Sequence, residues 1–308
     1  MYDVIIIGGG PAGAAAGVYS ARKKLKTLLI ADSFGGQSLV SNNIENWIGV
    51  KKMTGLELAK MLEEHVKAYE NVEIKMPEKV ISIKEISSGW EVSTDKNNIY
   101  QTKALIVASG GRRRHLNILG EDKFEGKGVS YCSTCDAPVF KNKTVAVIGG
   151  GDAGAEAVVN LLPYAAKIYF INHSSELTAS LFIIGEVKKS SKVYIINNAE
   201  TQEIFGDKFV SGLKYLDKND NQIKELEVEG IFVEIGSVPN SEFIKDLVDT
   251  NQAGEIIVDH KTGATTHPGI FAAGDVTDEI YKQNNISAGD AVAAALSAYN
   301  YLLNIKKQ

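Results

Sequence analysis

The sequence predicts an α/β fold built from two Rossmann-like, three-layer units. The first observation is a short β-branched strand at 3–7 that runs directly into a glycine-rich turn and an alanine-rich helix. The second is a repeat of the same arrangement, which begins with a strand at 144–148. A strand, a glycine turn and a helix in this order indicate a dinucleotide-binding βαβ unit.

The first glycine turn, at 8–13, has the pattern G-x-G-x-x-G. Gly8 permits the tight turn, Gly10 lets the backbone approach a pyrophosphate, and Gly13 lets the helix pack close to the strand. The amino end of the helix then faces the phosphate charge. Because a second strand follows at 27–30, we expect a dinucleotide site here.

The second unit repeats these elements in the same order. Its glycine turn at 149–154 is followed by a helix to about Leu162 and by a strand at 167–171. The two units together predict two nucleotide folds in one chain. Other strands that end in turns are expected at 104–111, 229–236 and 269–275, and an apolar helix at 287–303.

The only two cysteines of the chain lie in one tetrapeptide, Cys132-Ser133-Thr134-Cys135, directly before Asp136. A C-x-x-C near a βαβ unit indicates a redox-active dithiol. The alternative is half of a zinc site, which needs four ligands. Because the sequence has neither a second cysteine pair nor a histidine pair at H-x3-5-H spacing, we expect a redox dithiol and no metal.

Length and charge exclude several classes of protein. A chain of 308 residues is long enough for two domains with full cores. Its net charge of −5 gives no basic footprint for nucleic acid. No apolar run approaches the roughly eighteen residues of a membrane span, and Met1-Tyr2-Asp3 leads into a strand without a cationic leader. We therefore expect a cytoplasmic protein, and a reducing cytosol suits a cycling dithiol.

Six motifs, in order along nearly the whole chain, resemble the low-molecular-weight thioredoxin reductases of the flavin-dependent disulfide oxidoreductases. They are Gly8–Gly13, Gly35-Gly36-Gln37, Glu45-Asn46-Trp47, Cys132-x-x-Cys135-Asp136, Gly149–Gly154 and Gly269–Asp275. The resemblance implies two domains of the FAD/NAD(P)-binding type, the second inserted into the first. The FAD domain would comprise 1–112 and 243–308, and the inserted NAD(P)-binding-like domain, 113–242, would carry the dithiol.

The resemblance also implies one FAD per chain, a homodimer, and thioredoxin as the disulfide substrate. The cofactor contacts that it implies are Gly8, Gly10, Pro11, Ala12, Gly13, Asp32, Gly36, Gln37, Asn46, Gly110, Gly274, Asp275, Lys282 and Gln283. Gln37 and Asn46 have an alternative as ordinary loop-capping residues, which turns favour. Asp32 lies about twenty residues after the glycine turn, where an acid can bind the adenosine ribose.

The resemblance assigns different functions to the two cysteines. Cys135 would face the flavin, and Cys132 would exchange with the partner disulfide through a mixed disulfide. Asp136 would act as acid or base for the departing thiolate. Aspartate is also a favoured helix cap, so capping is the alternative function of Asp136.

The chain departs from this family at the nucleotide end of the second unit. NADPH-dependent members carry a His-Arg-Arg-x-x-x-Arg run, but here His173 is followed by Ser174, Ser175 and Ala179 at the arginine positions. Arginine binds a 2′-phosphate through paired, charge-assisted hydrogen bonds that serine cannot replace. The acid that would specify NADH is also missing, since Asn172 ends the strand. The sequence therefore argues against specific binding of NADPH and does not specify NADH.

These losses resemble the pyridine-nucleotide-independent thioredoxin reductases, whose flavin is reduced by ferredoxin. Our leading hypothesis is accordingly a ferredoxin-dependent thioredoxin reductase. One alternative is a thioredoxin reductase that uses NADPH or NADH through other contacts, and another is a non-catalytic flavin-binding redox sensor. The run Arg112-Arg113-Arg114 is interpreted as a solvated linker, with a docking patch for an acidic ferredoxin as the alternative.

Overall fold

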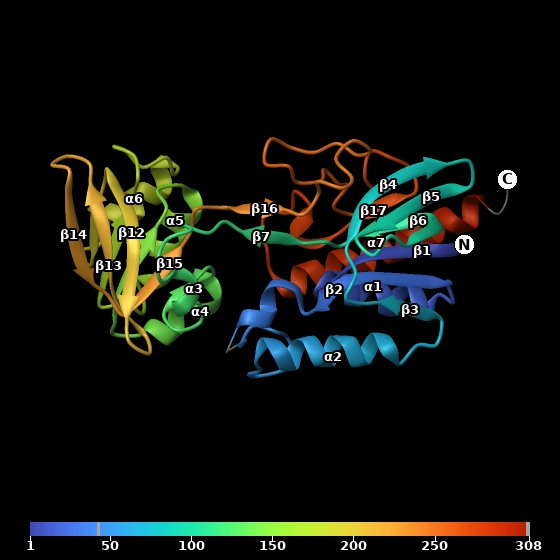
Figure 1. Cartoon of the computed structure of the whole chain (residues 1–308), viewed down its shortest axis with the longest axis horizontal. Coiled ribbons are helices and arrows are strands. Elements are labelled where there is room, and N and C mark those ends of the chain that lie inside the picture. Colours follow the sequence, from blue (N-terminus) through green and yellow to red (C-terminus); the bar gives the residue numbers. More distant parts are fainter. Residues whose placement is uncertain (42–43, 306–308) are drawn as a thin grey trace. The chain divides into compact units, whose positions relative to one another are not determined.

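The computed structural model describes residues 1–41 and 44–305. The chain divides into two compact units, which we call the terminal unit (Met1–Arg112 with Val238–Gln308) and the inserted unit (Arg113–Ser237) (Figure 1). The chain passes between them in β7 (Gly111–Arg113) and β16 (Ser237–Pro239), which pair as a two-stranded sheet. The predicted α/β fold with Rossmann-like sheets is confirmed.

The terminal unit is built on a seven-stranded sheet. Its strands are β1 (Tyr2–Gly9), β2 (Thr27–Phe34), β3 (Val72–Lys75), β4 (Val80–Ile86), β5 (Gly89–Thr94), β6 (Ile99–Val107) and β17 (Ile270–Ala272). Their order is β3-β2-β1-β6-β5-β4, with β17 beside β6. The part from β3 to β6, together with β17, is parallel, while β4 and β5 form an antiparallel extension.

Helices cover one face of this sheet. They are α1 (Pro11–Arg22), α2 (Gly55–Lys67) and α7 (Asn284–Ile305), with the short 3-10 helices η1 (Gly36–Val40) and η3 (Gly274–Val276) at the ends of strands. Small side chains such as Ala16, Ala294 and Ala298 let α1 and α7 pack closely against each other. The opposite face is a second core that includes Trp90 and Ile256. These three layers place the carboxyl ends of β1 and β17 beside the amino end of α1.

The inserted unit has a five-stranded parallel sheet in the order β11-β10-β9-β15-β8. Its strands are β8 (Val129–Ser130), β9 (Thr144–Ile148), β10 (Lys167–Ile171), β11 (Val193–Ile196) and β15 (Gly230–Val233). Its helices are α3 (Glu121–Phe124), α4 (Ser133–Asp136), η2 (Ala137–Phe140), α5 (Asp152–Leu161) and α6 (Leu181–Lys189). An antiparallel sheet of β12 (Ala199–Gly206), β13 (Val210–Asp217) and β14 (Gln222–Glu227) covers the second face.

The second division between the units lies at 237/238, five residues before the boundary proposed from the sequence. Residues 238–242 belong with the terminal unit because Asn240 is tied to the end of β6. The Ser109 hydroxyl donates to the Asn240 carbonyl oxygen at 2.6 Å, and the Asn240 side-chain amide donates to the Ser109 carbonyl oxygen at 2.9 Å. The Asn240 backbone amide also donates to the Gly110 carbonyl oxygen.

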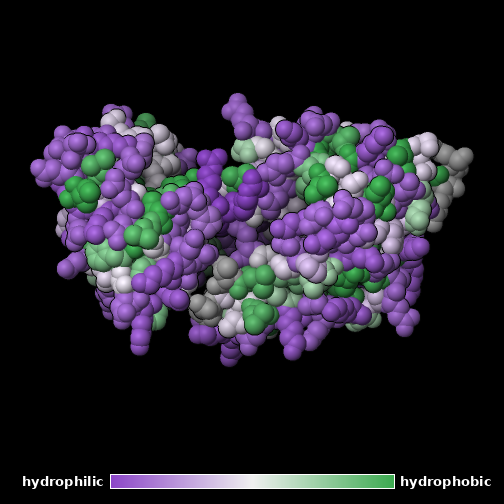
Figure 2. Space-filling view, in the orientation of Figure 1, coloured by the Kyte–Doolittle hydropathy of each residue, from purple (hydrophilic) through white to green (hydrophobic). Residues whose placement is uncertain are grey.

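The surface seen in Figure 2 is mainly hydrophilic, with apolar side chains scattered over it. This pattern agrees with cores that are enclosed within each unit. In the described ranges, 1–41 and 44–305, no helix combines the length and the apolar character needed to cross a membrane.

Candidate flavin and dithiol sites

The first glycine turn connects β1 to α1 and requires glycine at two of its positions. Gly8 has a φ of +121°, and a Cβ added to it would lie 2.1 Å from the carbonyl oxygen of Ala108. A Cβ on Gly13 would lie 1.9 Å from the carbonyl oxygen of Gly8. Both contacts are with backbone, which cannot move aside easily, so these glycines set the close packing of α1 on β1.

Gly10 differs from its neighbours because the space in front of it is open. A Cβ on Gly10 would meet only the Cα of Gly36, at 4.0 Å. Gly10 is also the N-cap of α1, where no side chain caps the helix and no acid occupies the first turn. The first amides of a helix have no partner within the helix and attract anions. Pro11 has no N–H to donate, so the open space at Gly10 and the amides that follow Pro11 are what fit the pyrophosphate of FAD.

Asp275 lies at the same end of the sheet and is held by two side chains. The Ser287 hydroxyl donates to its Oδ1 at 3.0 Å, and the Gln37 amide donates to its Oδ2 at 3.5 Å. Gly274, with a φ of +76°, brings this segment against Ala12, whose Cβ would lie 3.1 Å from a Cβ on Gly274. The structure thus brings Gln37, Gly274 and Asp275 together with the glycine turn, and their binding of FAD stays a prediction.

A second polar group joins Asn46 to the start of α7. The Asn46 side-chain amide donates to Gln283 Oε1 at 3.2 Å. Asn285 extends this contact, since its side chain donates to the Asn46 carbonyl oxygen at 2.6 Å and accepts from the Ile48 amide at 3.3 Å. Sequence reasoning missed the contact of Asn285 with Asn46 and Ile48, although the run Gln283-Asn284-Asn285 was a visible signal. Asn46 is therefore part of a network between segments and not merely a loop cap.

For three of the predicted cofactor contacts, the described part of the structure gives no direct contact with the glycine turn. Lys282 forms an ion pair with Glu255 at 2.9 Å. Asp32, near the end of β2, is exposed and pairs with Lys79 at 3.1 Å. Gly110 has a φ of +66° and open space around the position of a Cβ. The binding of FAD by Lys282, Asp32 and Gly110 stays a prediction.

The two cysteines form a disulfide at the start of α4, with their Cα atoms 5.3 Å apart. Strand β8 leads into this segment, and Cys132 is the N-cap of α4. The Cys135 amide donates to Cys132 Sγ at 3.3 Å. Cys132 is half-buried, whereas Cys135 is exposed. The C-x-x-C thus has the geometry of a redox-active disulfide on a short helix.

Asp136 ends α4 and turns back toward the strand that precedes it. The Ser130 hydroxyl donates to Asp136 Oδ2 at 2.6 Å. Burial raises the pKa of the Asp136 carboxyl, and the hydrogen bond from Ser130 opposes this effect. At its N-cap position before η2, Asp136 makes no side-chain capping hydrogen bond, so the capping alternative is wrong for this helix. Asp136 is therefore a half-buried carboxyl with a raised pKa, which binds a proton more readily than an exposed aspartate.

The second glycine turn, between β9 and α5, repeats the close contacts of the first. A Cβ on Gly149 would lie 2.1 Å from the Glu234 carbonyl oxygen, and a Cβ on Gly154 would lie 1.7 Å from the Gly149 carbonyl oxygen. The segment after β10 closes on this turn, since the Thr178 amide donates to the Gly150 carbonyl oxygen at 2.9 Å. The Rossmann backbone is thus intact in the inserted unit.

The side chains at the end of β10 bind one another. Asn172 is buried, and its amide donates to the Ser174 carbonyl oxygen at 2.9 Å. The cation beside His173 is Lys218, whose Nζ lies 2.6 Å from His173 Nε2 and 3.3 Å from Glu200 Oε2. Because Glu200 neutralises Lys218, this end of the sheet does not replace the charge of the missing arginines.

Arg112 is bound within the terminal unit. Its guanidinium donates to Glu242 Oε1 at 2.6 Å and to Asn240 Oδ1 at 2.8 Å. Arg112 is thus exposed to solvent while it pairs with Glu242, and the interpretation of 112–114 as a solvated linker stays a prediction.

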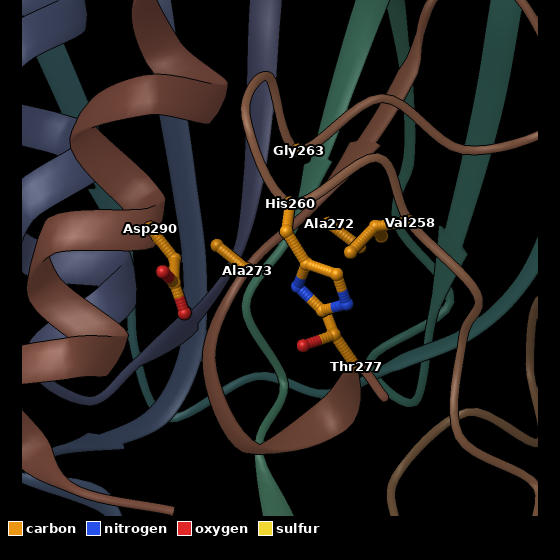
Figure 3. A pocket seen from close by; sticks show the side chains of 7 residues that line it. All are labelled: Val258, His260, Gly263, Ala272, Ala273, Thr277 and Asp290. Carbon is orange, nitrogen blue, oxygen red and sulfur yellow. The ribbon is translucent and has the colours of Figure 1, made fainter. Parts of the chain in front are cut away.

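A small pocket in the terminal unit is lined by Val258, His260, Gly263, Ala272, Ala273, Thr277 and Asp290 (Figure 3). Asp290 projects from α7 and His260 from the facing loop. The pocket has room for about one water molecule, which is too small for an organic ligand. Within the described residues, no cluster of three or more histidine, cysteine, aspartate or glutamate side chains could hold a metal ion.

The family model described as "Pyridine nucleotide-disulphide oxidoreductase" matches residues 2–294. The chain is 43% identical, over 98% of its length, to a Bacillus subtilis protein named "NADH dehydrogenase" and also to a Pseudomonas aeruginosa protein named as part of an alkyl hydroperoxide reductase. It spans only 59% and 58% of the length of these curated relatives. The structure of thioredoxin reductase from Streptococcus pyogenes MGAS5005 is 33% identical, with a TM-score of 0.92 over 99% of both chains.

Proposed function

Because the chain belongs to the pyridine nucleotide-disulphide oxidoreductase family, we propose that it is an FAD-dependent thioredoxin reductase whose electrons come from reduced ferredoxin. One observation supports the disulfide chemistry above all others: the C-x-x-C disulfide is followed directly by the half-buried Asp136, whose carboxyl accepts a short hydrogen bond from Ser130. The structural relative named as a thioredoxin reductase supports thioredoxin as the substrate.

The terminal unit would hold the FAD. The amides at the start of α1 would bind the pyrophosphate beside Gly10 and Gly36, and Asp275 would accept a hydrogen bond from a ribityl hydroxyl. When bound, FAD supplies the ability to accept single electrons and pass on two, which protein side chains lack. The hydrogen bond from Ser287 keeps the Asp275 carboxylate oriented toward the site.

The inserted unit would perform the disulfide exchange. The thiolate of Cys132 attacks one sulfur of the thioredoxin disulfide, so that a mixed disulfide forms and a thioredoxin thiolate leaves. Asp136 gives its proton to the leaving thiolate, which its raised pKa favours. The Cys135 thiol then gives its proton to the second thioredoxin sulfur and attacks Cys132 Sγ, which breaks the mixed disulfide, re-forms the Cys132–Cys135 disulfide and releases thioredoxin as a dithiol. Two electrons and two protons thus pass to thioredoxin.

The choice of ferredoxin as donor rests on the nucleotide end of the inserted unit. NADPH carries a 2′-phosphate, which needs cations to replace its hydration. Ser174, Ser175 and Ala179 supply none, and Lys218 is already paired with Glu200. A donor of single electrons, such as ferredoxin, does not need this part of the fold.

A nicotinamide nucleotide is the second candidate donor. The glycine turn at Gly149–Gly154 keeps the Rossmann backbone, and one relative is named "NADH dehydrogenase". NADH lacks the 2′-phosphate and so does not require the missing arginines. A direct comparison of donors is therefore needed.

The disulfide chemistry is tested with variants of the two cysteines. With ferredoxin kept reduced and thioredoxin disulfide in excess, we expect the protein to produce thioredoxin thiols and both Cys132→Ser and Cys135→Ser to abolish this. Cys135→Ser should accumulate a mixed disulfide with thioredoxin on a non-reducing gel, and Cys132→Ser should not. Thr134→Ser, an exposed position of the same tetrapeptide, is the matched control. Failure to reduce thioredoxin with ferredoxin, NADH and NADPH alike would reject the proposal.

A further inference from the structure

Glu234 occupies a position between the second glycine turn and the disulfide. It directly follows β15, which lies between β9 and β8 in the parallel sheet. Its backbone amide donates to the Ile148 carbonyl oxygen at 2.8 Å. Because β8 leads into α4, the position of Glu234 at the carboxyl end of β15 directs its side chain toward α4.

The Glu234 carboxyl contacts the first turn of this helix. Glu234 Oε1 accepts a hydrogen bond from the Ser133 amide at 3.3 Å. Asn160 of α5 holds the same turn through its side-chain amide, which donates to Ser133 Oγ at 3.2 Å and to Thr134 Oγ1 at 3.4 Å. Glu234 and Asn160 thus fix the two residues that separate Cys132 from Cys135.

We propose that Glu234 is a proton-linked positioning residue of the dithiol, which takes up a proton when the Cys132–Cys135 disulfide is reduced. This inference rests on the proposed function only in requiring that the disulfide cycles. It assigns to Glu234 a function separate from that of Asp136, which donates its proton to the leaving thiolate.

The surroundings of Glu234 suit proton uptake near neutral pH. Burial raises the pKa of Glu234 to about 7, opposed by Arg113 and by the Ser133 hydrogen bond, while Glu156 adds to the rise. The charged side chains that act on Glu234 are Arg113 of β7 and Glu156 of α5. The two cysteines and Asp136 lie in the α4 segment, which Glu234 contacts through the Ser133 amide. A new thiolate in this group therefore adds negative charge beside a carboxyl that is half-ionised near pH 7.

The proton balance gives a measurable consequence. Two electrons and one proton convert the disulfide into one thiol and one thiolate. The thiolate raises the proton affinity of Glu234, so that above about pH 7 a second proton binds there. Each further pH unit then makes reduction about tenfold harder than in a protein without this carboxyl, which corresponds to about 30 mV for a two-electron couple. Below pH 7 Glu234 is already protonated, and the extra dependence disappears.

The experiment compares the flavin-loaded full chain with Glu234→Gln in dithiothreitol redox buffers, from about pH 5.5 to about pH 8.5, a range centred on the Glu234 pKa of about 7. Thiol alkylation and mass spectrometry report the oxidised fraction, because the chain has only two cysteines. The glutamine oxygen can still accept from the Ser133 amide, so the variant should keep α4 in place, and its melting temperature checks this. Glu229→Gln is the matched control, since Glu229 lies at the other end of β15, where it accepts from the Thr144 amide.

We expect the proteins to agree within about twofold at the acid end. At the alkaline end, Glu234→Gln should be about tenfold easier to reduce than the unaltered protein and Glu229→Gln. Titrations of Glu234→Gln and the unaltered protein that run parallel over the whole range would overturn the proposal. The experiment uses neither thioredoxin, ferredoxin nor a nucleotide. Its result therefore does not depend on whether the proposed substrate and electron donor are correct.

Discussion

The glycine turns at Gly8–Gly13 and Gly149–Gly154 have nearly the same backbone but different surroundings. In each, the first glycine has a positive φ, +121° and +129°, and a Cβ on it would lie 2.1 Å from a carbonyl oxygen of the neighbouring strand end. In each, the last glycine packs against the carbonyl oxygen of the first. The glycine pattern therefore predicts the close packing of helix on strand in both units.

The differences begin at the helix that follows. Helix α1 starts with Pro11 and has no acid in its first turn, whereas α5 starts with Asp152. Asp152 accepts a hydrogen bond from the Ser180 amide at 2.7 Å, and Thr178 binds the carbonyl oxygen of Gly150. A Cβ on Gly10 would meet Gly36 of η1 at 4.0 Å, whereas a Cβ on Gly151 would meet the Thr178 side chain, from the segment after β10, at 3.7 Å. The glycine pattern thus accounts for the fold of both units, and the different flanking side chains are the basis of our proposal that only the first turn holds a nucleotide.

The largest expected effect is on FAD affinity, and it should distinguish the two turns when the same substitution is made in each. Gly10→Val should lower FAD affinity by about 100-fold or more, because the side chain enters the space through which the backbone approaches the pyrophosphate. Gly10 has an ordinary φ of −72°, so the fold should survive. Gly151→Val, the equivalent change in the second turn, should leave the FAD content unchanged. Flavin absorbance per chain after gel filtration measures both, and equal loss in the two variants would contradict the difference between the turns.

Asp136→Asn should lower thioredoxin reduction by about 100-fold, the effect of removing a general acid. Because burial raises the pKa of Asp136, the protonated form persists to a higher pH than in an exposed aspartate, and activity should fall as pH rises through that pKa. The asparagine variant should lose this alkaline limb. Turnover measured against pH in both proteins tests this, and an unchanged profile would remove Asp136 from the proton transfer.

Restoring the missing cations tests why the second turn differs. The triple variant Ser174→Arg, Ser175→Arg and Ala179→Arg should bind NADPH at least about tenfold more tightly, since each charge-assisted hydrogen bond contributes about 1.5–3 kcal/mol. Turnover driven by ferredoxin should stay the same. Calorimetric titration with NADPH, and with NADH as the control that lacks the 2′-phosphate, measures the change. An unaltered NADPH affinity would show that the arginine positions are not what limits this site.

The smallest expected effect concerns the start of α2, where protein side chains cap the helix and no cofactor is needed. Helix α2 begins with a capping box in which Thr54 and Glu57 bind each other's backbone amides. Thr54→Ala should destabilise the terminal unit by about 1 kcal/mol without loss of FAD affinity. Both tryptophans, Trp47 and Trp90, lie in this unit, so their fluorescence during urea unfolding reports the change. Thr54→Ser keeps the hydroxyl and should behave like the unaltered protein.

The fold and the local motifs were predictable because they depend on short-range patterns. The strands and glycine turns of both units follow from β-branched runs that end in glycine, and the redox pair follows from its spacing. The extent of α7, Asn284–Ile305, was underestimated because its polar first turn lacks helical periodicity.

The remaining features depend on contacts between distant segments. Nothing local in Glu229-Gly-Ile-Phe-Val-Glu234 indicates that Glu234 meets Ser133, a contact over 101 residues. The hydrogen bonds between Asn240 and Ser109 likewise place residues 238–242 in the terminal unit, and not in the inserted unit as the sequence predicted. These bonds join residues 131 positions apart, so the sequence alone does not indicate them. Lys79 and Glu200, which pair with Asp32 and Lys218, could not be assigned from sequence because exposed ion pairs leave no pattern along the chain.

An anaerobic titration of the flavin absorbance tests most directly which donor reduces the flavin. Purified flavin-loaded protein is mixed separately with reduced ferredoxin, NADPH and NADH, and the bleaching of the flavin band is followed. We expect reduced ferredoxin to bleach the flavin fully and neither nucleotide to do so at micromolar concentration. Rapid bleaching by NADPH or NADH would contradict this expectation and would show that the second glycine turn still binds a nucleotide donor.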